Sequence, residues 1–176
     1  MITFNENQRV HFGSDLLDLK MTYEKPLFVT HKPRGLWYGF GDSWISWCFR
    51  EGCNSFVNKR NSIHELNIDL EQILVIDSKE KLIEFSNKYG TSILGRKSFK
   101  GFKESVDWAE VMSQYKGIEI SPYYPSFDLG NDFFWYFGWD CASGCLWDLS
   151  CLKEEPKLLY SKADQTGWDY NEVEKE

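Results

Sequence analysis

The pattern of apolar and polar residues along the chain predicts several short strands and about three helices. Apolar runs typical of strands cover residues 9–12, 35–38, 63–68, 73–76, 118–120, 145–147 and 158–160. Apolar residues at helical spacing predict one helix from the Asp77-Ser78 cap to Gly90 and another over residues 106–116. Because the strands are both adjacent and distant in sequence, the pattern indicates an α+β domain.

The segment 33–49, PRGLWYGFGDSWISWCF, has the most distinctive pattern in the chain. It holds three of the eight tryptophans, and it predicts a strand, a glycine turn and a helix capped by Asp42 and Ser43. The tryptophans are Trp37, Trp44 and Trp47. Two interpretations remain open: core aromatics of a small domain, or indole faces that wall a flat ligand.

Composition and charge narrow the classes of protein. The 176 residues are 42% hydrophobic and 17% aromatic, which predicts one domain over residues 1–160 with an acidic, disordered tail at 161–176. A net charge of −7 disfavours indiscriminate binding to nucleic acid or anionic membranes. The sequence shows neither a signal peptide nor an apolar run of the roughly 20 residues that span a bilayer, so we expect a cytoplasmic protein.

Familiar catalytic and metal motifs are absent from the sequence. The chain lacks the nucleophile elbow of hydrolases and the P-loop of nucleotide hydrolases. An odd count of five cysteines favours reduced, buried thiols, and their spacing does not favour zinc; we expect no metal. A polar loop is predicted after Gly52, and a basic loop over residues 90–104 is either solvated or meets a partner.

Two polar side chains are candidates for chemistry. His11 ends a strand just before a Gly-Ser turn, where it could face a cleft, whereas His64 is expected to point to solvent and His31 to be exposed. Asp140 lies among aromatic and small residues, where a carboxylate is costly unless it is used or paired. The alternative is that Asp140 caps its own turn by a local hydrogen bond.

These residues together resemble the ADP-ribosyltransferase superfamily, which has H-Y-[E/D/Q]-type motifs. The resemblance rests on a histidine followed by Gly13 and Ser14, the Gly35-Leu-Trp-Tyr strand leading into an aromatic helix, and a late acid. It implies an α+β fold in which split mixed and antiparallel sheets, flanked by about three helices, form an NAD cleft. The segments KPRGLW, DWAEVMSQYKGIEISPY and WDCASGCLW also resemble a family of short, uncharacterised bacterial and phage proteins.

The resemblance implies a role for each motif. His11, with Gly13 and Ser14, would contact the NAD ribose; Gly35, Trp37 and Trp47 (or Trp44) would hold the nicotinamide; Asp140 would stabilise the oxocarbenium-like transition state. The chain departs from the usual pattern, with Trp for Tyr, Asp for Glu, and Gly138 where arginine-modifying members carry Glu or Gln. Arginine is therefore a doubtful acceptor.

The function implied by the resemblance is mono-ADP-ribosyl transfer from NAD, its substrate, to a macromolecular acceptor. That acceptor is expected to be a protein rather than nucleic acid. The enzyme itself is expected to be toxin-like, monomeric and cytoplasmic, or located in the host cytoplasm if it is phage-encoded. The acceptor would approach through residues 90–104 or 123–132. One alternative is a non-enzymatic binding module on the same fold, such as a phage-encoded inhibitor of a host protein; another is an immunity or structural protein with a packed tryptophan cluster.

Overall fold

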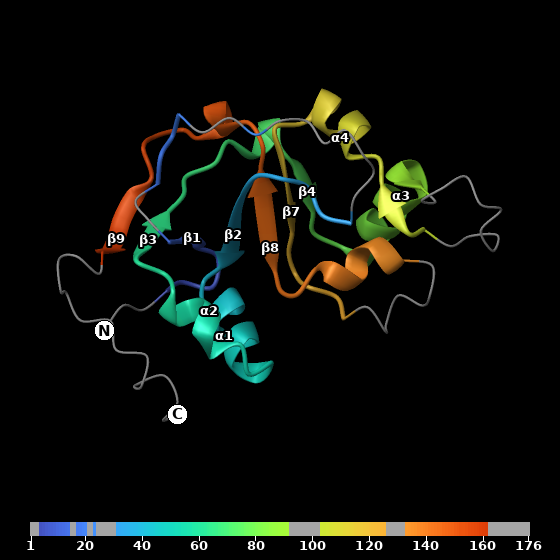
Figure 1. The fold of residues 1–176 in the computed structure, drawn as a ribbon. Helices are drawn as coiled ribbons and strands as arrows, with labels where there is room; N and C mark the ends of the chain where they lie inside the picture. The colour runs from blue at the N-terminus through green and yellow to red at the C-terminus, as the bar shows by residue number, and fades with distance from the viewer. Residues whose placement is uncertain are drawn as a thin grey trace.

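The protein is an α+β structure built on a mixed seven-stranded sheet (Figure 1). The computed structural model describes residues 4–14, 17–20, 23, 31–91, 103–125 and 133–161. The large sheet contains β1 (Arg9–Gly13), β2 (Leu36–Phe40), β3 (Ser62–Glu65), β4 (Leu74–Ile76), β7 (Gly117–Ile120), β8 (Ser143–Leu146) and β9 (Lys157–Ser161). A second sheet pairs β5 (Gly90–Thr91) with β6 (Ser105–Val106).

The order of the strands brings distant parts of the chain together. The large sheet runs β4-β7-β8-β2-β1-β3-β9, and each neighbouring pair is antiparallel except β4 and β7, which are parallel. The late strand β8 therefore lies beside the early strand β2, with Trp37 opposite Cys145. Gly35, just before β2, allows this close approach, since a Cβ there would overlap the carbonyl oxygen of Leu146.

The helices lie at two places along the sheet (Figure 1). The described residues form α1 (Ser43–Arg50), α2 (Asn54–Asn58), α3 (Lys79–Tyr89) and α4 (Trp108–Gln114), with the 3₁₀ helices η1 (Leu70–Gln72), η4 (Phe134–Gly138) and η5 (Leu149–Cys151). Helices α1 and α2 lie together near β1 and β2, whereas α3 and α4 lie at the β4 end (Figure 1). Asn54–Asn58 corrects the predicted loop after Gly52, because Val57 on α2 is buried.

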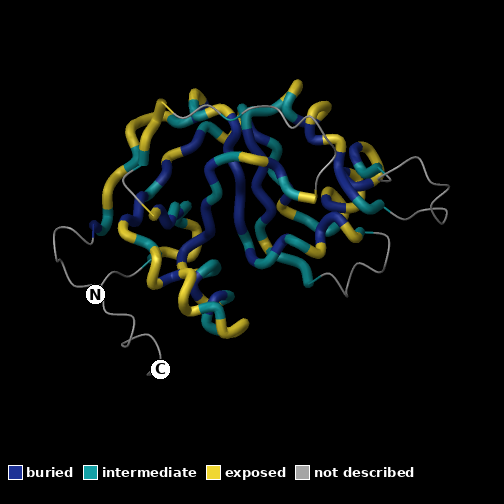
Figure 2. The backbone as a smooth tube through the Cα atoms, in the orientation of Figure 1, coloured by how far each residue is buried: buried dark blue, intermediate teal, exposed yellow. Residues whose placement is uncertain are grey.

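The largest part of the core is aromatic. Trp108 of α4, Trp135 and Tyr136 of η4, and Trp139 are buried together in one cluster with residues of α3. Figure 2 shows the central strands buried and the exposed residues on the outer loops and helices. Core packing is one of the two interpretations considered for the aromatic residues, and it applies to Trp108, Trp135 and Trp139.

The start of α1 differs from the predicted cap. The Asp42 side chain makes no capping bond to a backbone N–H; instead its Oδ2 accepts from Ser46 Oγ at 3.0 Å. The Ser43 hydroxyl accepts from Phe40 N at 3.0 Å and donates to Ala142 O at 2.8 Å. Ser43 thus fixes the start of α1 to the turn before β8, and Gly41 makes the turn between β2 and α1 with a φ of 55°.

A buried polar network joins three strands of the large sheet. Arg9 on β1 donates to both carboxylate oxygens of Glu119 on β7, at 2.8 and 2.9 Å. Tyr38 on β2 donates to the same carboxylate at 2.9 Å, and burial keeps the pKa of Tyr38 well above its usual value. Charge-assisted, bidentate bonds of this kind fix the relative positions of the strands they join.

Some predicted segments lie beyond the described residues. Of the predicted tail at 161–176, the structure describes Ser161, which ends β9. Residues 92–102 of the basic loop and 126–132 of the second proposed acceptor loop are likewise outside the described ranges. In the described part of the chain, no helix has the length and apolar character needed to cross a membrane.

Candidate functional site

A pocket of about 690 Å³ gathers most of the site residues predicted from the sequence. The predicted residues that line it are His11, Gly13, Ser14, Gly35, Trp37, Trp44 and Asp140. Trp47 is not among the described residues of the lining. The strand order explains why these residues lie together, because β1 and β2 are neighbours, β8 pairs with β2, and Asp140 lies three residues before Ser143, the first residue of β8.

His11 is held in one orientation by the neighbouring strand. Its Nδ1 lies 2.7 Å from the carbonyl oxygen of Trp37. Because a carbonyl only accepts, Nδ1 carries the proton and the neutral ring has its lone pair on Nε2. Burial lowers the pKa of His11, although the bond to Trp37 opposes the shift. At neutral pH the pocket therefore contains a neutral imidazole that can accept a hydrogen bond.

His64 is buried, which corrects the expectation that it points to solvent. It is 5% exposed, lies opposite His11 in the β1–β3 register, and its Nδ1 has no hydrogen-bond partner. Burial lowers the pKa of His64 as it does for His11. Two adjacent histidines with lowered pKa values, His64 buried and His11 half-buried, make the fold sensitive to acid.

We expect stability to fall as pH is lowered below about 6.5, the value from which both histidine pKa values are depressed. The unfolded chain binds protons there while the folded state resists them, so the stabilising contribution is present above that pH and is lost as pH falls toward the folded-state pKa values. Urea unfolding between pH 7.5 and 5.5 measures the slope. Combining His11→Asn with His64→Asn should flatten it, and exposed His31→Asn should leave it unchanged; an equal slope in all three proteins contradicts the assignment.

Trp37 forms a supported aromatic wall. Its ring packs edge-on against the fully buried Trp139, with centroids 5.0 Å apart and planes at 62°. The side chain is half-buried and lines the pocket. The Lys32 ammonium lies 5.3 Å from the centre of the ring. Packing against Trp139 leaves Trp37 little freedom, so the wall is preorganised.

Trp44, rather than Trp47, supplies the helical aromatic of the pocket. Helix α1 buries Ile45 and Cys48, and Trp44 packs against Phe12 of β1 with centroids 5.1 Å apart. The Arg60 guanidinium lies 5.3 Å from the Trp44 ring. Trp37 and Trp44 therefore belong to one pocket, and each has a cation near its ring.

Asp140 forms an ion pair across the mouth of the pocket. Lys32 Nζ donates to Asp140 Oδ2 at 2.9 Å, and the two side chains are 38% and 35% exposed. The pairing is long-range, in place of the local turn bond considered as the alternative. The Lys32 chain passes over Gly138, where an added Cβ would lie 3.2 Å from Lys32 Cε. Exposed pairs of this kind contribute about 0.2–1 kcal/mol, so a ligand can displace this one.

The pocket also contains a thiol that is unsuited to nucleophilic attack. Cys141 lines it, and burial raises the pKa of Cys141 to about 11. The reactive thiolate is thus a minor form at neutral pH. All five cysteines are free, and among the described residues no group of three or more His, Cys, Asp or Glu side chains is placed to hold a metal ion.

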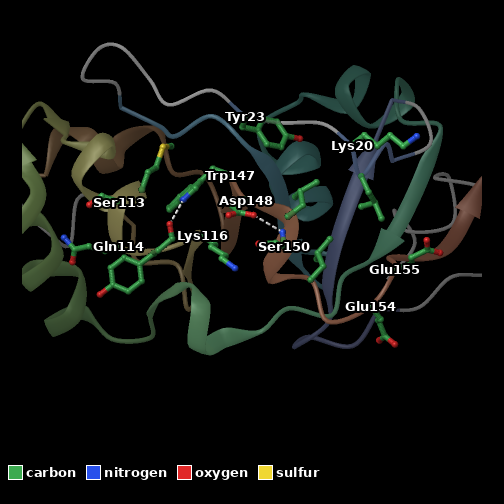
Figure 3. A pocket seen from close by; sticks show the side chains of 15 residues that line it. Lys20, Tyr23, Ser113, Gln114, Lys116, Trp147, Asp148, Ser150, Glu154 and Glu155 are labelled. Carbon is green, nitrogen blue, oxygen red and sulfur yellow. Dashed lines mark hydrogen bonds between the residues drawn. The ribbon is translucent and has the colours of Figure 1, made fainter.

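A second cavity, of about 1000 Å³, contains none of the predicted site residues (Figure 3). Its polar groups are engaged locally: Trp147 Nε1 donates to Tyr115 O at 2.6 Å, and Asp148 Oδ1 accepts from Ser150 N at 2.9 Å (Figure 3). Lys116 Nζ bonds to Gln72 Oε1. This larger cavity also has a carboxylate, Asp148, among aromatic side chains, but that carboxylate accepts from Ser150 and the cavity gathers none of the predicted motif residues. The smaller pocket is therefore the better candidate site.

Sequence reasoning missed two cations of the candidate site, Lys32 and Arg60. Lys32 precedes Pro33 in a segment that looked like an ordinary loop, and Arg60 was assigned to the predicted polar loop. Nothing in their local sequence distinguishes them from solvated charges. Comparisons of the chain with protein-family models, curated proteins and solved structures found no match.

Proposed function

We propose that the protein transfers ADP-ribose from NAD to a macromolecular acceptor, and that the pocket between β1, β2 and α1 binds NAD. The observation that carries the proposal is the convergence of His11, Trp37, Trp44 and Asp140 on one pocket. The resemblance required a histidine, an aromatic strand, a helical aromatic and a late acid to meet. A volume of about 690 Å³ is within the usual range for small-molecule sites.

The chemistry follows from the positions of these groups. The bond that breaks joins the nicotinamide nitrogen to ribose C1′, and its electron pair leaves with the nicotinamide. Trp37 and Trp44 offer aromatic faces to the flat nicotinamide, and the Asp140 carboxylate stabilises the positive charge that develops on the ribose. The neutral His11 imidazole accepts a hydrogen bond from a ribose hydroxyl through Nε2. A nucleophile of the acceptor then bonds to C1′ and loses its proton.

The ion pair with Lys32 determines whether the Asp140 carboxylate is available to stabilise the ribose cation. In the structure the Lys32 ammonium is paired with the carboxylate that the reaction needs. NAD brings its own positive charge to the same region, so binding of NAD exchanges one cation beside Asp140 for another. Because both side chains are more than a third exposed, this exchange costs little.

The direct test is incubation with NAD labelled in the adenylate part, with and without cell lysate. We expect nicotinamide release and transfer of label to a lysate protein. Release without transfer would identify an NAD hydrolase instead. No release and no transfer at millimolar NAD, by a protein shown to be folded, contradicts the proposal.

The choice between the two helical tryptophans gives a separate prediction. Trp44→Ala should weaken NAD binding about tenfold, because base-sized rings stacked on an aromatic side chain gain roughly 1–3 kcal/mol. Trp47→Ala is the matched control on the same helix and should change the affinity less than about twofold. Isothermal titration with NAD measures both. A larger loss in Trp47→Ala than in Trp44→Ala would show that the wrong face of α1 has been assigned.

The Lys32–Asp140 pair also favours a second candidate, a non-enzymatic binding module that kept the fold. A carboxylate already neutralised at 2.9 Å suits a surface that binds a host protein without using NAD. This candidate predicts no thermal protection by NAD. It also predicts a stable protein complex that survives His11→Ala and Asp140→Asn.

A further inference from the structure

Arg60 lies in the pocket lining because its loop is hydrogen-bonded to the end of β1. Its own N–H donates to Val57 O at 2.9 Å, at the end of α2. The next residue, Asn61, donates through its backbone to Gly13 O at 2.8 Å and through its side chain to Ser14 O at 2.6 Å. These bonds place Arg60 beside the same Gly-Ser turn that lines the pocket.

In the described part of the chain, the guanidinium of Arg60 has an aromatic contact and no acidic partner. It lies 5.3 Å from the Trp44 ring, and its Nε is buried with no hydrogen-bond acceptor. No ion pair among the described residues includes Arg60, whereas Arg9 and Arg50 each pair with a glutamate. A buried N–H without an acceptor is uncommon in folded proteins and suggests a missing partner.

The charges of the pocket lining show what kind of partner is missing. Lys32 and Asp140 neutralise each other at one part of the pocket. The exposed Asp18 also lines the pocket, and its Oδ1 accepts from Lys20 N at 2.9 Å. Among the described residues, Arg60 is a cation with no paired carboxylate. Its planar fork of N–H groups matches the oxygens of phosphate.

We propose that Arg60, stacked on Trp44, binds the phosphate or diphosphate group of a nucleotide at the end of the pocket formed by β1 and α1. That the nucleotide is NAD rests on the proposed function. The anion site itself is inferred from the contacts of Arg60 alone. It orients the ligand: the phosphates lie beside Arg60, near Gly13 and Ser14, and the nicotinamide lies against Trp44 and Trp37, toward Asp140. Arg60 thus selects phosphorylated ligands over nucleosides.

Isothermal titration with ADP and with adenosine tests this anion site without turnover. We expect the wild-type protein to bind ADP about tenfold more tightly than adenosine, since charge-assisted bonds contribute roughly 1.5–3 kcal/mol. Arg60→Met should remove that preference and leave adenosine binding unchanged. Arg60→Lys, which keeps the charge but loses the fork, should lose part of it. Arg50→Met, an arginine outside the pocket lining, should match wild type.

The outcomes separate the anion site from the proposed enzyme. ADP binding that depends on Arg60, without NAD turnover, supports the site and contradicts the enzyme. Inorganic pyrophosphate binding as tightly as ADP supports the anion site but assigns it to free phosphates. Equal binding of ADP and adenosine to wild type overturns the proposal even if Arg60→Met does not fold. ADP affinity retained in a folded Arg60→Met protein overturns it too, whatever the NAD turnover.

Discussion

Asp140→Asn is expected to lower the rate of nicotinamide release from NAD by about 100- to 1000-fold, the usual cost of removing a group that stabilises developing charge. The amide keeps the size of the carboxylate but loses its negative charge, so the ribose cation is no longer stabilised. The NAD affinity should change much less than the rate, because the aromatic walls and Arg60 remain. Steady-state assays of nicotinamide release give both quantities.

The matched control is Asp77→Asn, which removes another paired surface aspartate. Asp77 accepts from Lys81 at 2.8 Å and is not a residue of the pocket lining. Its rate should equal that of wild type, and both variants should unfold at the wild-type temperature. A folded Asp140→Asn protein with the wild-type rate would remove Asp140 from the reaction.

The second large effect concerns stability. Glu119→Ala should lower the free energy of unfolding by about 3 kcal/mol, because it leaves the half-buried Arg9 charged and without its carboxylate partner. The Glu119 side chain is 5% exposed, accepts two bonds from Arg9 and one from Tyr38, and joins β1, β2 and β7. Urea unfolding monitored by circular dichroism measures the loss.

An exposed ion pair of equal length provides the comparison. Lys81 and Asp77 are also 2.8 Å apart, but both side chains are about half exposed. Lys81→Met should therefore cost less than about 1 kcal/mol. If Glu119→Ala costs no more than Lys81→Met, the network does not hold the strands together, and the geometry of the pocket must depend on other contacts.

The sequence was most informative where local pattern and burial agree. The α+β class, the strand around Trp37, and the helix that ends at Gly90 were predicted from apolar spacing and caps. His11 and Asp140 were chosen because their neighbours made a polar side chain unusual, and both line the pocket. The pattern favoured Trp47 over Trp44, whereas Trp44 lines the pocket; periodicity separates the two poorly, since both flank the buried stripe of Ile45 and Cys48.

Other features depend on tertiary contacts that local sequence does not encode. His64 was expected in solvent, but β3 lies inside the sheet between β1 and β9, and the His64 side chain is buried. The short helix α2 is polar except for Phe56 and the buried Val57, so periodicity had little to detect. Lys32 and Arg60 become part of the site through contacts with Asp140 and Trp44, from segments distant along the chain.

The most direct test of the account is a crystal structure of the Asp140→Asn variant soaked with NAD. We expect the substitution to slow cleavage, so intact NAD should be visible. We expect the nicotinamide against Trp37 and Trp44, ribose C1′ facing the side chain at position 140, and Lys32 displaced from that side chain. NAD bound elsewhere, or no NAD in the pocket at saturating concentration, would contradict the assignment of this pocket as an NAD site.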